Sequence, residues 1–336
     1  MNAQLPTTEI SGPPNLYPGF VHFALRALVP GTEAPCEIRL ETIPPHQRDP
    51  RLVVALPRHA EIAPAWRQRL LQSGVTHLFA PLEELDLLLA YLSQQSQLVL
   101  AGPAAGADPT LGSLLAYEHA LCCLKAALLD PRNGRRLGLG AATVRKLVGM
   151  IWDNDTTRQA MLKVLSRDQE LASHGLNTCL LAVGFVRRLG WSRLTAERLG
   201  LAMFYHDLGL VDLDHPGPDD AIWDGIREGK SIEDHPRLGR DLLLRVEGLD
   251  PGVPELVYSH HENLDGSGYP RGLSGEAIDR EARVARIVDI YETGTSGAGG
   301  RQYMNPYALL LVMRNEIGLW LDRPLLEQFV RFLGHI

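Results

Sequence analysis

Histidines and acids recur through the C-terminal half of this chain, and nearly all of them border apolar segments. There are eight such residues: Glu170, His174, His206, Asp207, His235, His260, His261 and Asp289. Imidazole and carboxylate groups are together the usual ligands of borderline and hard divalent cations. Because this set exceeds what one ion can use, it predicts a site for two or more ions. Such a site requires helices far apart in the sequence to meet around one cavity.

Two pairs in this set also have simpler interpretations. Glu170 and His174 are four positions apart, so on a helix they project from one face, where such a pair is commonly structural or solvated. His206 and Asp207 end an apolar segment at Gly209, and burying both is costly unless something pairs with them. A metal would pair with both, and Asp207 would then bridge two ions. The alternative is a His-Asp hydrogen bond at the helix end.

The other candidates lie in similar surroundings. His235 begins a helical pattern, a position from which a ring can point into a pocket. His260 and His261 follow an apolar turn, and because neighbouring helical side chains diverge by about 100°, the two rings could serve different ions. Asp289 lies inside an otherwise apolar helix, where its alternative role is a salt bridge to a nearby arginine.

The segment after the two adjacent histidines is rich in turn residues. Asp265, Gly266, Gly268 and Pro270 predict a tightly turned loop. Such a loop brings backbone N–H groups and the side chain of Tyr269 close to the neighbouring site. We therefore expect this segment to form one wall of a pocket.

Composition restricts the class of protein. An apolar content of 45% and a charged content of 22% are typical of a soluble globular chain. A net charge of −7 argues against non-specific DNA binding. No apolar run approaches the roughly 18 residues of a membrane span, and the N-terminus lacks the pattern of a secretory signal. The cysteines form no CxxC pattern and are expected to be reduced thiols, so we expect a cytoplasmic protein.

The sequence predicts four parts: a flexible N-terminus at 1–15, a small α/β regulatory module at 16–100, a linker with connecting helices at 101–164, and an all-helical domain at 165–336. The linker begins with a Gly/Pro/Ala-rich stretch at 101–109. Hydrophobic patterning predicts strands at 51–57 and 77–80, and helices at 63–72, 82–93, 111–129 and 141–164. The module contains no phosphate-loop or dinucleotide fingerprint.

Four segments of the helical domain resemble the HD-GYP family, a subgroup of the HD metal-dependent phosphohydrolases. They are HDLG at 206–209, HPRLG at 235–239, HHENLDGSGYPRGL at 260–273 and ARVARIVD at 282–289. They occur in the family's order across 165–336, and the third string is highly specific. The resemblance implies an α-helical HD-type phosphohydrolase domain preceded by a small α/β N-terminal domain.

The resemblance also implies a metal centre and a reaction. The ligands would be the eight residues of the histidine and acid set, with Asp207 bridging two ions and Glu170 binding a third. The ions would be two or three divalent metals, iron or alternatively manganese. His206 and Asp207 would be the catalytic residues. The family's substrate is cyclic di-GMP, which a metal-activated water hydrolyses to linear pGpG or to GMP.

The resemblance further suggests which residues meet the substrate and a partner. Those expected to bind substrate are Tyr269, Arg283, Arg301 and Tyr303. The loop residues Gly268, Tyr269 and Pro270 are associated in this family with docking to GGDEF-type diguanylate cyclase domains, so they are expected to bind such a partner. The amphipathic stretch at 141–170 could pair with its copy in a homodimer or pack on its own domain.

The sequence departs from the family pattern where charge would meet substrate. Leu210 stands in place of a lysine after the HDxG motif, and losing such a contact can cost about 10²–10³ in rate. Residues 292–295 replace Asp-Ala-Leu-Thr, Met304 replaces a basic residue, and the segment around Arg301 aligns only across an insertion. Two hypotheses follow: a cyclic di-GMP phosphodiesterase weakened by Leu210, or a signalling module that binds cyclic di-GMP or a GGDEF-type protein. If the missing charge matters, Leu210→Lys should raise turnover or affinity.

Overall fold

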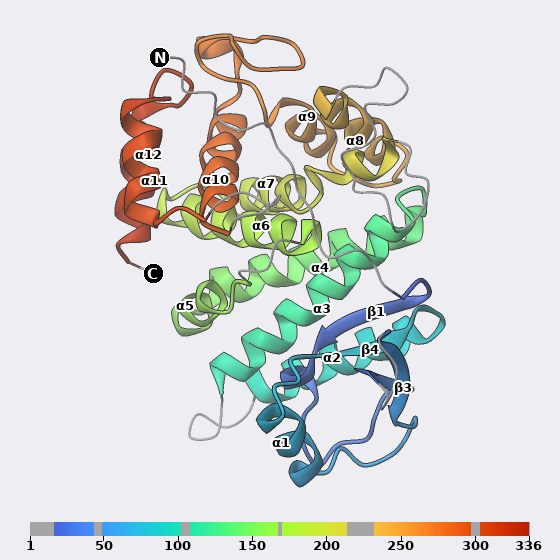
Figure 1. The fold of residues 1–336 in the computed structure, drawn as a ribbon. Coiled ribbons are helices and arrows are strands. Elements are labelled where there is room, and N and C mark those ends of the chain that lie inside the picture. The colour runs from blue at the N-terminus through green and yellow to red at the C-terminus, as the bar shows by residue number, and fades with distance from the viewer. Residues whose placement is uncertain are drawn as a thin grey trace. The chain divides into compact units, whose positions relative to one another are not determined.

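The structure is a computed structural model that describes residues 17–43, 49–101, 108–166, 170–213, 232–296 and 303–335. The described chain divides into two compact units, one formed by Tyr17–Ala126 and the other beginning at Ala127 (Figure 1). The boundary falls inside a helix, α3 (Pro109–Leu129), rather than at the Gly/Pro/Ala-rich stretch. The reason is that α3 is apolar on most of its surface and contributes Leu115, Cys122 and Ala126 to the core of the N-terminal unit.

The N-terminal unit contains a four-stranded antiparallel sheet of order β1-β4-β2-β3. The strands are β1 (Phe20–Ala24), β2 (Ile38–Thr42), β3 (Arg51–Leu56) and β4 (His77–Pro81), and the helices before α3 are α1 (Pro64–Gln72) and α2 (Leu85–Leu100). The strands expected at 51–57 and 77–80 and the helices expected at 63–72 and 82–93 are therefore present. The sequence patterns missed β1 and β2, which are only five residues each and carry polar residues among the apolar ones.

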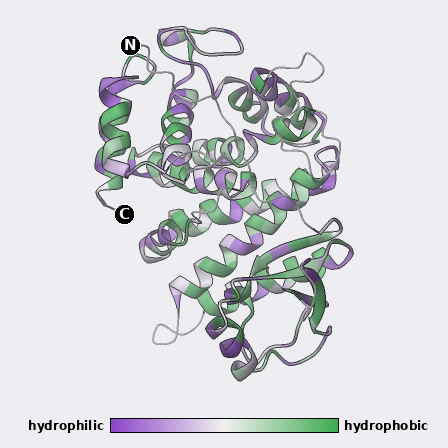
Figure 2. Cartoon of the chain, viewed as in Figure 1, coloured by the Kyte–Doolittle hydropathy of each residue, from purple (hydrophilic) through white to green (hydrophobic). Residues whose placement is uncertain are grey.

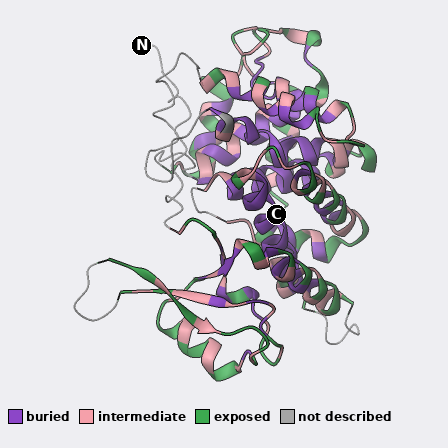
Figure 3. Ribbon diagram, turned by 90° about the vertical axis from the view of Figure 1, so that its right-hand side faces the viewer, coloured by how far each residue is buried: buried purple, intermediate pink, exposed green. Residues whose placement is uncertain are grey.

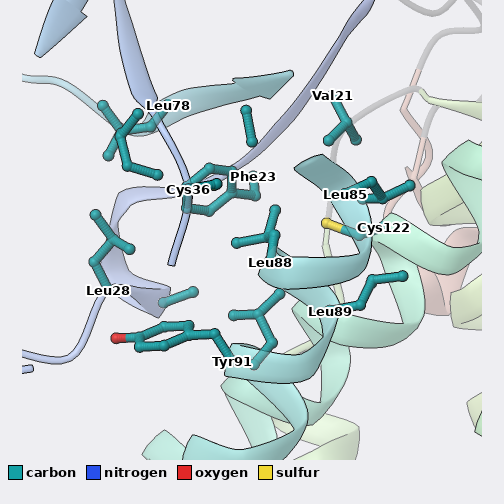
Figure 4. Packing of buried hydrophobic residues seen from close by; sticks show 14 of the residues in the cluster. Val21, Phe23, Leu28, Cys36, Leu78, Leu85, Leu88, Leu89, Tyr91 and Cys122 are labelled. Carbon is teal, nitrogen blue, oxygen red and sulfur yellow. The ribbon is translucent and has the colours of Figure 1, made fainter. Parts of the chain in front are cut away.

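Side chains from both ends of the N-terminal unit's sequence form its core (Figure 4). Alternate residues of β1 and β4 are buried, including Phe23 and Leu78. They pack with Leu88 of α2 and Cys122 of α3. The four cysteines of the chain are all buried free thiols, as their sequence context predicts.

The C-terminal unit is helical throughout its described residues. Its helices are α4 (Gly134–Asp153), α5 (Asp155–Lys163), α6 (Leu171–Arg188), α7 (Arg193–Tyr205), α8 (His235–Leu243), α9 (Gly252–Ser259), α10 (Arg280–Ser296), α11 (Pro306–Asn315) and α12 (Arg323–Leu333). Helix α6 is central, because it packs against α4, α5, α7, α10 and α12. Figure 3 shows buried residues concentrated in these inner helices, and Figure 2 shows apolar and polar residues alternating along α12.

Local capping explains where several of these helices begin and end. The helix expected at 141–164 is two helices, because the side chain of Asn154 accepts a hydrogen bond from the Thr157 amide and starts α5. Gly190 follows α6 with φ of +74°, a conformation that glycine adopts without strain. This bend allows α7 to return along α6.

Among the described helices, α3 alone is long and apolar enough to be a candidate membrane span, and 83% of its apolar window is buried inside the protein. The core helix of a soluble protein passes the same test, so the candidate carries little weight.

Candidate metal centre

Seven of the eight candidate ligands converge in the C-terminal unit. They come from α6, from the ends of α7 and α9, from the start of α8 and from the middle of α10, and all are buried: His174, His206, Asp207, His235, His260, His261 and Asp289. Their side chains form two groups of potential ligand atoms that share Asp207. Helices far apart in the sequence therefore meet at one cluster.

The first group consists of His174, His206 and Asp207. Nε2 of His174 lies 3.0 Å from Nε2 of His206, and the latter nitrogen lies 3.2 Å from Oδ2 of Asp207. Asp289 adds Oδ1 at 3.4 Å from Nε2 of His174. Two imidazoles and two carboxylates thus point at one small volume.

The second group consists of Asp207, His235, His260 and His261. Nε2 of His235 lies 3.2 Å from Oδ1 of Asp207 and 3.2 Å from Nε2 of His260. The two oxygens of Asp207 therefore face different groups, which is the geometry that a carboxylate bridging two ions requires.

Backbone carbonyls orient three of the rings in the same way. In each, Nδ1 donates to the carbonyl oxygen three residues earlier, at 2.7, 2.7 and 2.6 Å: His206, His235 and His260. These rings lie at the ends of helical segments, where carbonyls lack an intrahelical partner. With the ring proton held on Nδ1, the lone pair of Nε2 points into the cluster.

A carboxylate orients the fourth ring. Glu292 contacts Nδ1 of His174 and accepts hydrogen bonds from Asn177 at 2.8 Å and from Ser296 at 3.2 Å. The sequence reasoning missed this role, because it treated 292–295 only as a departure from the family pattern. The available signal was the spacing: Glu292 follows Asp289 by three positions, so both project from one face of α10.

The chemistry of these donors fits divalent cations. In their neutral forms, His174 and His206 present two lone pairs to each other across 3.0 Å, and His235 and His260 do the same across 3.2 Å. Such pairs repel unless a proton or a metal ion lies between them, and the carboxylate oxygens beside them favour a cation. The buried Nε2 of His261 also has no hydrogen-bond partner among the described residues.

The cluster's charges shift the pKa values of its members. Burial alone would raise the pKa of Asp207, but His206 and His235 outweigh burial and hold it well below its usual range. Burial, reinforced by His206 and His235, lowers the pKa of His260 to about 3. Burial would lower the pKa of His174 as well, but the neighbouring carboxylates outweigh it and raise that pKa well above the ordinary value. Ionised carboxylates and a neutral His260 are in the protonation states that bind metal, whereas a protonated His174 releases its proton when it binds an ion.

Two glycines allow the close backbone contacts that hold this arrangement. A Cβ atom on Gly209 would lie 2.0 Å from the carbonyl oxygen of His235 and 2.6 Å from the amide nitrogen of Gly239. A Cβ atom on Gly268 would lie 2.4 Å from the carbonyl oxygen of His261. The first contact packs the turn after Asp207 against α8, and the second packs the loop 264–273 against the two adjacent histidines.

The buried carboxylate of Glu262 holds this loop in place. Glu262 accepts hydrogen bonds from the amides of Arg271 and Leu273, both at 2.8 Å. The ring of Tyr269 stacks on that of His261, with 4.7 Å between centroids. Burial raises the pKa of Tyr269, and its hydroxyl has no hydrogen-bond partner among the described residues. The loop therefore forms a wall beside the cluster, with Gly268, Tyr269 and Pro270 half-buried.

The other residues that the sequence predicted for the site are not members of the two ligand groups. Glu170 is the N-cap of α6 and belongs to neither group of clustered ligand atoms. Arg283 donates to the carbonyls of Gly275 and Ile278 and pairs with Asp322, so its contacts support the helix packing, and its role in substrate binding stays a prediction. Tyr303 is 52% exposed. Arg301 lies outside the described residues.

Leu210 is not directed at open solvent. Its side chain is 3% exposed and packs with Leu213 against a small apolar group made by Leu171, Ile232 and Leu238. The position where the family carries a lysine is therefore part of an apolar wall in this chain. A lysine placed there would enter this wall, so the gain expected of Leu210→Lys requires its ammonium group to leave it.

Known proteins that are similar in sequence indicate the family of this chain. Residues 159–325 match the family described as HD domain. A cyclic di-GMP phosphodiesterase of Pseudomonas aeruginosa is 26% identical over 241 residues, covering 70% of this chain and 58% of that protein. The cyclic di-GMP phosphodiesterase response regulator RpfG of Xanthomonas campestris is 27% identical over 56% of this chain and 51% of that protein. The 3′3′-cGAMP-specific phosphodiesterase 1 of Vibrio cholerae is 29% identical over 49% of this chain and 38% of that protein.

The fold also has a solved counterpart. An HDG"Y"P protein from Bdellovibrio bacteriovorus superposes with a TM-score of 0.69, covering 94% of this chain and 99% of that one at 16% identity, which shows a shared fold. The chain spans about half the length of the curated relatives it matches. With the HD-domain match, the relatives and the shared fold in agreement, the chain belongs to the HD-GYP family of HD-domain proteins.

Proposed function

We propose that this protein is a metal-dependent phosphodiesterase that hydrolyses cyclic di-GMP to linear pGpG or GMP. The observation that carries the proposal is two pairs of opposed imidazole Nε2 atoms joined by one carboxylate, Asp207, whose two oxygens face different groups. Structural roles for these residues would not require Nε2 atoms to face each other beside carboxylates. Relatives named as cyclic di-GMP phosphodiesterases support the choice of substrate.

The residues that would hold the ions divide between the two groups. One ion would be held by His174, His206, Asp207 and Asp289, and the other by Asp207, His235, His260 and His261. We propose two ions, one for each of the two groups of potential ligand atoms. Iron is the preferred metal and manganese the alternative, since both accept this mixed nitrogen and oxygen set. Bound ions supply an activated water and neutralise charge on the phosphate oxygens.

The protein's own groups orient the ligands and shape the substrate side. Glu292 and the backbone carbonyls hold a proton on Nδ1 of four rings, so that the Nε2 atoms of His174, His206, His235 and His260 already point into the cluster. The ring of Tyr269 lies against that of His261, and its hydroxyl has no hydrogen-bond partner among the described residues; we propose that this hydroxyl donates a hydrogen bond to the nucleotide.

One observation favours a second candidate function. Because Leu210 removes a cation that the family uses, the protein could retain metals and bind cyclic di-GMP without turning it over. It would then act as a signalling module, with Gly268, Tyr269 and Pro270 available to a GGDEF-type partner. The binding site would be the same in both cases, and only hydrolysis of the bound nucleotide would be absent.

Product analysis separates these candidates. Protein loaded anaerobically with iron or with manganese is incubated with cyclic di-GMP and, in parallel, with 3′3′-cGAMP, and products are separated chromatographically. The proposal expects pGpG or GMP from cyclic di-GMP, with loss of activity in Asp207→Ala and retention in Asp241→Ala, a half-exposed aspartate of α8. Binding without product supports the signalling module. Fully loaded protein that neither binds nor hydrolyses either nucleotide would refute both.

A further inference from the structure

Arg286 is the arginine that reaches the metal-ligand cluster. It lies in α10, one turn before Asp289, and only 13% of its side chain is exposed. Nε donates to Oδ1 of Asn263 at 3.0 Å, and Nη1 donates to Nδ1 of His261 at 2.9 Å. Nη1 also lies 3.4 Å from Oδ2 of Asp289. Among the described residues, no other arginine or lysine has a hydrogen bond or ion pair with a member of the two ligand groups.

The contact with His261 defines the state of that ring. A guanidinium can only donate, so Nδ1 of His261 must carry a lone pair. A ring that has a lone pair on Nδ1 cannot be the doubly protonated imidazolium, so His261 is neutral in this arrangement. Its single proton is therefore on Nε2, the buried atom that has no partner among the described residues.

This arrangement is incompatible with metal binding by His261. If the ring binds an ion through Nδ1, it uses the lone pair that Arg286 now occupies. If it binds through Nε2, its proton moves to Nδ1 and faces the N–H group of the guanidinium. In both cases, Arg286 loses its acceptor as soon as a neutral His261 becomes a ligand.

The guanidinium then keeps only one long contact on its terminal nitrogens, from Nη1 to Oδ2 of Asp289 at 3.4 Å. Nη2 makes no hydrogen bond among the described residues even in the present arrangement, and Nη1 loses its shorter contact, the one to His261. Asn263 still holds Nε, and the ring of Trp320 lies 5.9 Å from the guanidinium carbon. A half-buried guanidinium with unused Nη2 donors favours a further anionic acceptor.

We propose that Arg286 exchanges His261 for a phosphate oxygen of the nucleotide when His261 becomes a metal ligand. The proposal rests on the function proposed above and identifies the cation that stands in for the lysine absent at position 210. It also makes nucleotide affinity depend on metal loading through one side chain, because the arginine is available only when His261 is occupied.

The test measures binding rather than turnover. A bis-phosphorothioate analogue of cyclic di-GMP and inorganic phosphate are titrated into metal-loaded and metal-free protein, and bound metal is counted in each sample. The variants are Arg286→Gln, Arg286→Lys, and Arg323→Gln as a control that removes an exposed arginine of α12. Thermal melting checks that each variant is folded.

In loaded protein, Arg286→Gln should keep the wild-type metal content and weaken analogue binding by about 10- to 100-fold, the range for one charged hydrogen bond. Arg286→Lys should recover part of that loss, and Arg323→Gln should behave as wild type. In metal-free protein, Arg286→Gln should change affinity less than about twofold, because His261 already holds the arginine.

Three results would overturn the proposal. These are an unchanged analogue affinity in fully loaded Arg286→Gln, a loss of metal that accounts for the loss of affinity, and an equal effect of the variant with and without metal. The proposed function fails separately: wild-type loaded protein would then bind phosphate through Arg286 but not the analogue. Failure of both probes to bind loaded wild-type protein rejects both proposals.

Discussion

Gly209→Ala tests whether the turn after Asp207 sets the geometry of the metal centre. The added Cβ would lie 2.0 Å from the carbonyl oxygen of His235 and 2.6 Å from the amide nitrogen of Gly239. Real Cβ atoms essentially never approach closer than 3.0 Å, so the two backbones must separate by roughly 1 Å. Both contacts are backbone atoms, so no flexible side chain can move aside.

Overpacking of this kind costs about 1–3 kcal/mol. For a unit of this size, each kcal/mol lowers Tm by roughly 2–4 °C, so the expected decrease is about 2–12 °C. The same shift would lengthen the 3.2 Å distance between Asp207 and His235, so we expect the variant to lose metal from the second group. Differential scanning calorimetry of metal-free protein and metal analysis after loading measure the two effects separately.

Gly138→Ala is the matched control. A Cβ atom at Gly138 meets nothing within 4 Å, and the residue lies inside α4, where alanine is favoured over glycine by about 1 kcal/mol. This variant should be slightly more stable than wild type and bind metal normally. If Gly209→Ala also melts within a degree of wild type and fills both groups with metal, the reasoning about close packing is wrong.

Three further predictions follow from the same cluster. Glu292→Gln should weaken metal binding by about 10- to 100-fold in a metal-buffered titration, because it removes the acceptor that orients His174; Glu327→Gln, on the surface of α12, should have no effect. The free energy of unfolding of metal-free protein should decrease as pH falls from about 6.5 towards 3. In this range His260 takes up a proton in the unfolded chain but not in the folded protein, where its pKa is about 3. In thermal melts recorded across pH, His260→Gln should reduce this dependence of stability on pH. Leu210→Lys should lower Tm by several degrees, because its ammonium group enters an apolar wall; an unchanged Tm would show that the lysine turns towards the site.

The helical class and the candidate ligands could be predicted from the sequence because both are written in local patterns. The motif strings from His206 to Asp289 place particular residue types at particular spacings, and amphipathic periodicity marks long helices such as α4. Strands β1 and β2 were missed, because polar residues interrupt the apolar pattern within their five residues. The split of the helix at Asn154 depended on a single capping side chain.

Tertiary structure alone decided how these residues act together. The sequence by itself determined the family and most of the ligand set, since those depend on residue identity and order. That the Nε2 atoms of His174 and His206 face each other, that Glu292 holds His174, that Arg286 holds His261 and that Leu210 is buried could not be read from it. Each of these facts depends on atoms from different helices approaching within about 4 Å, and such approaches are set by packing over the whole unit rather than by any one segment.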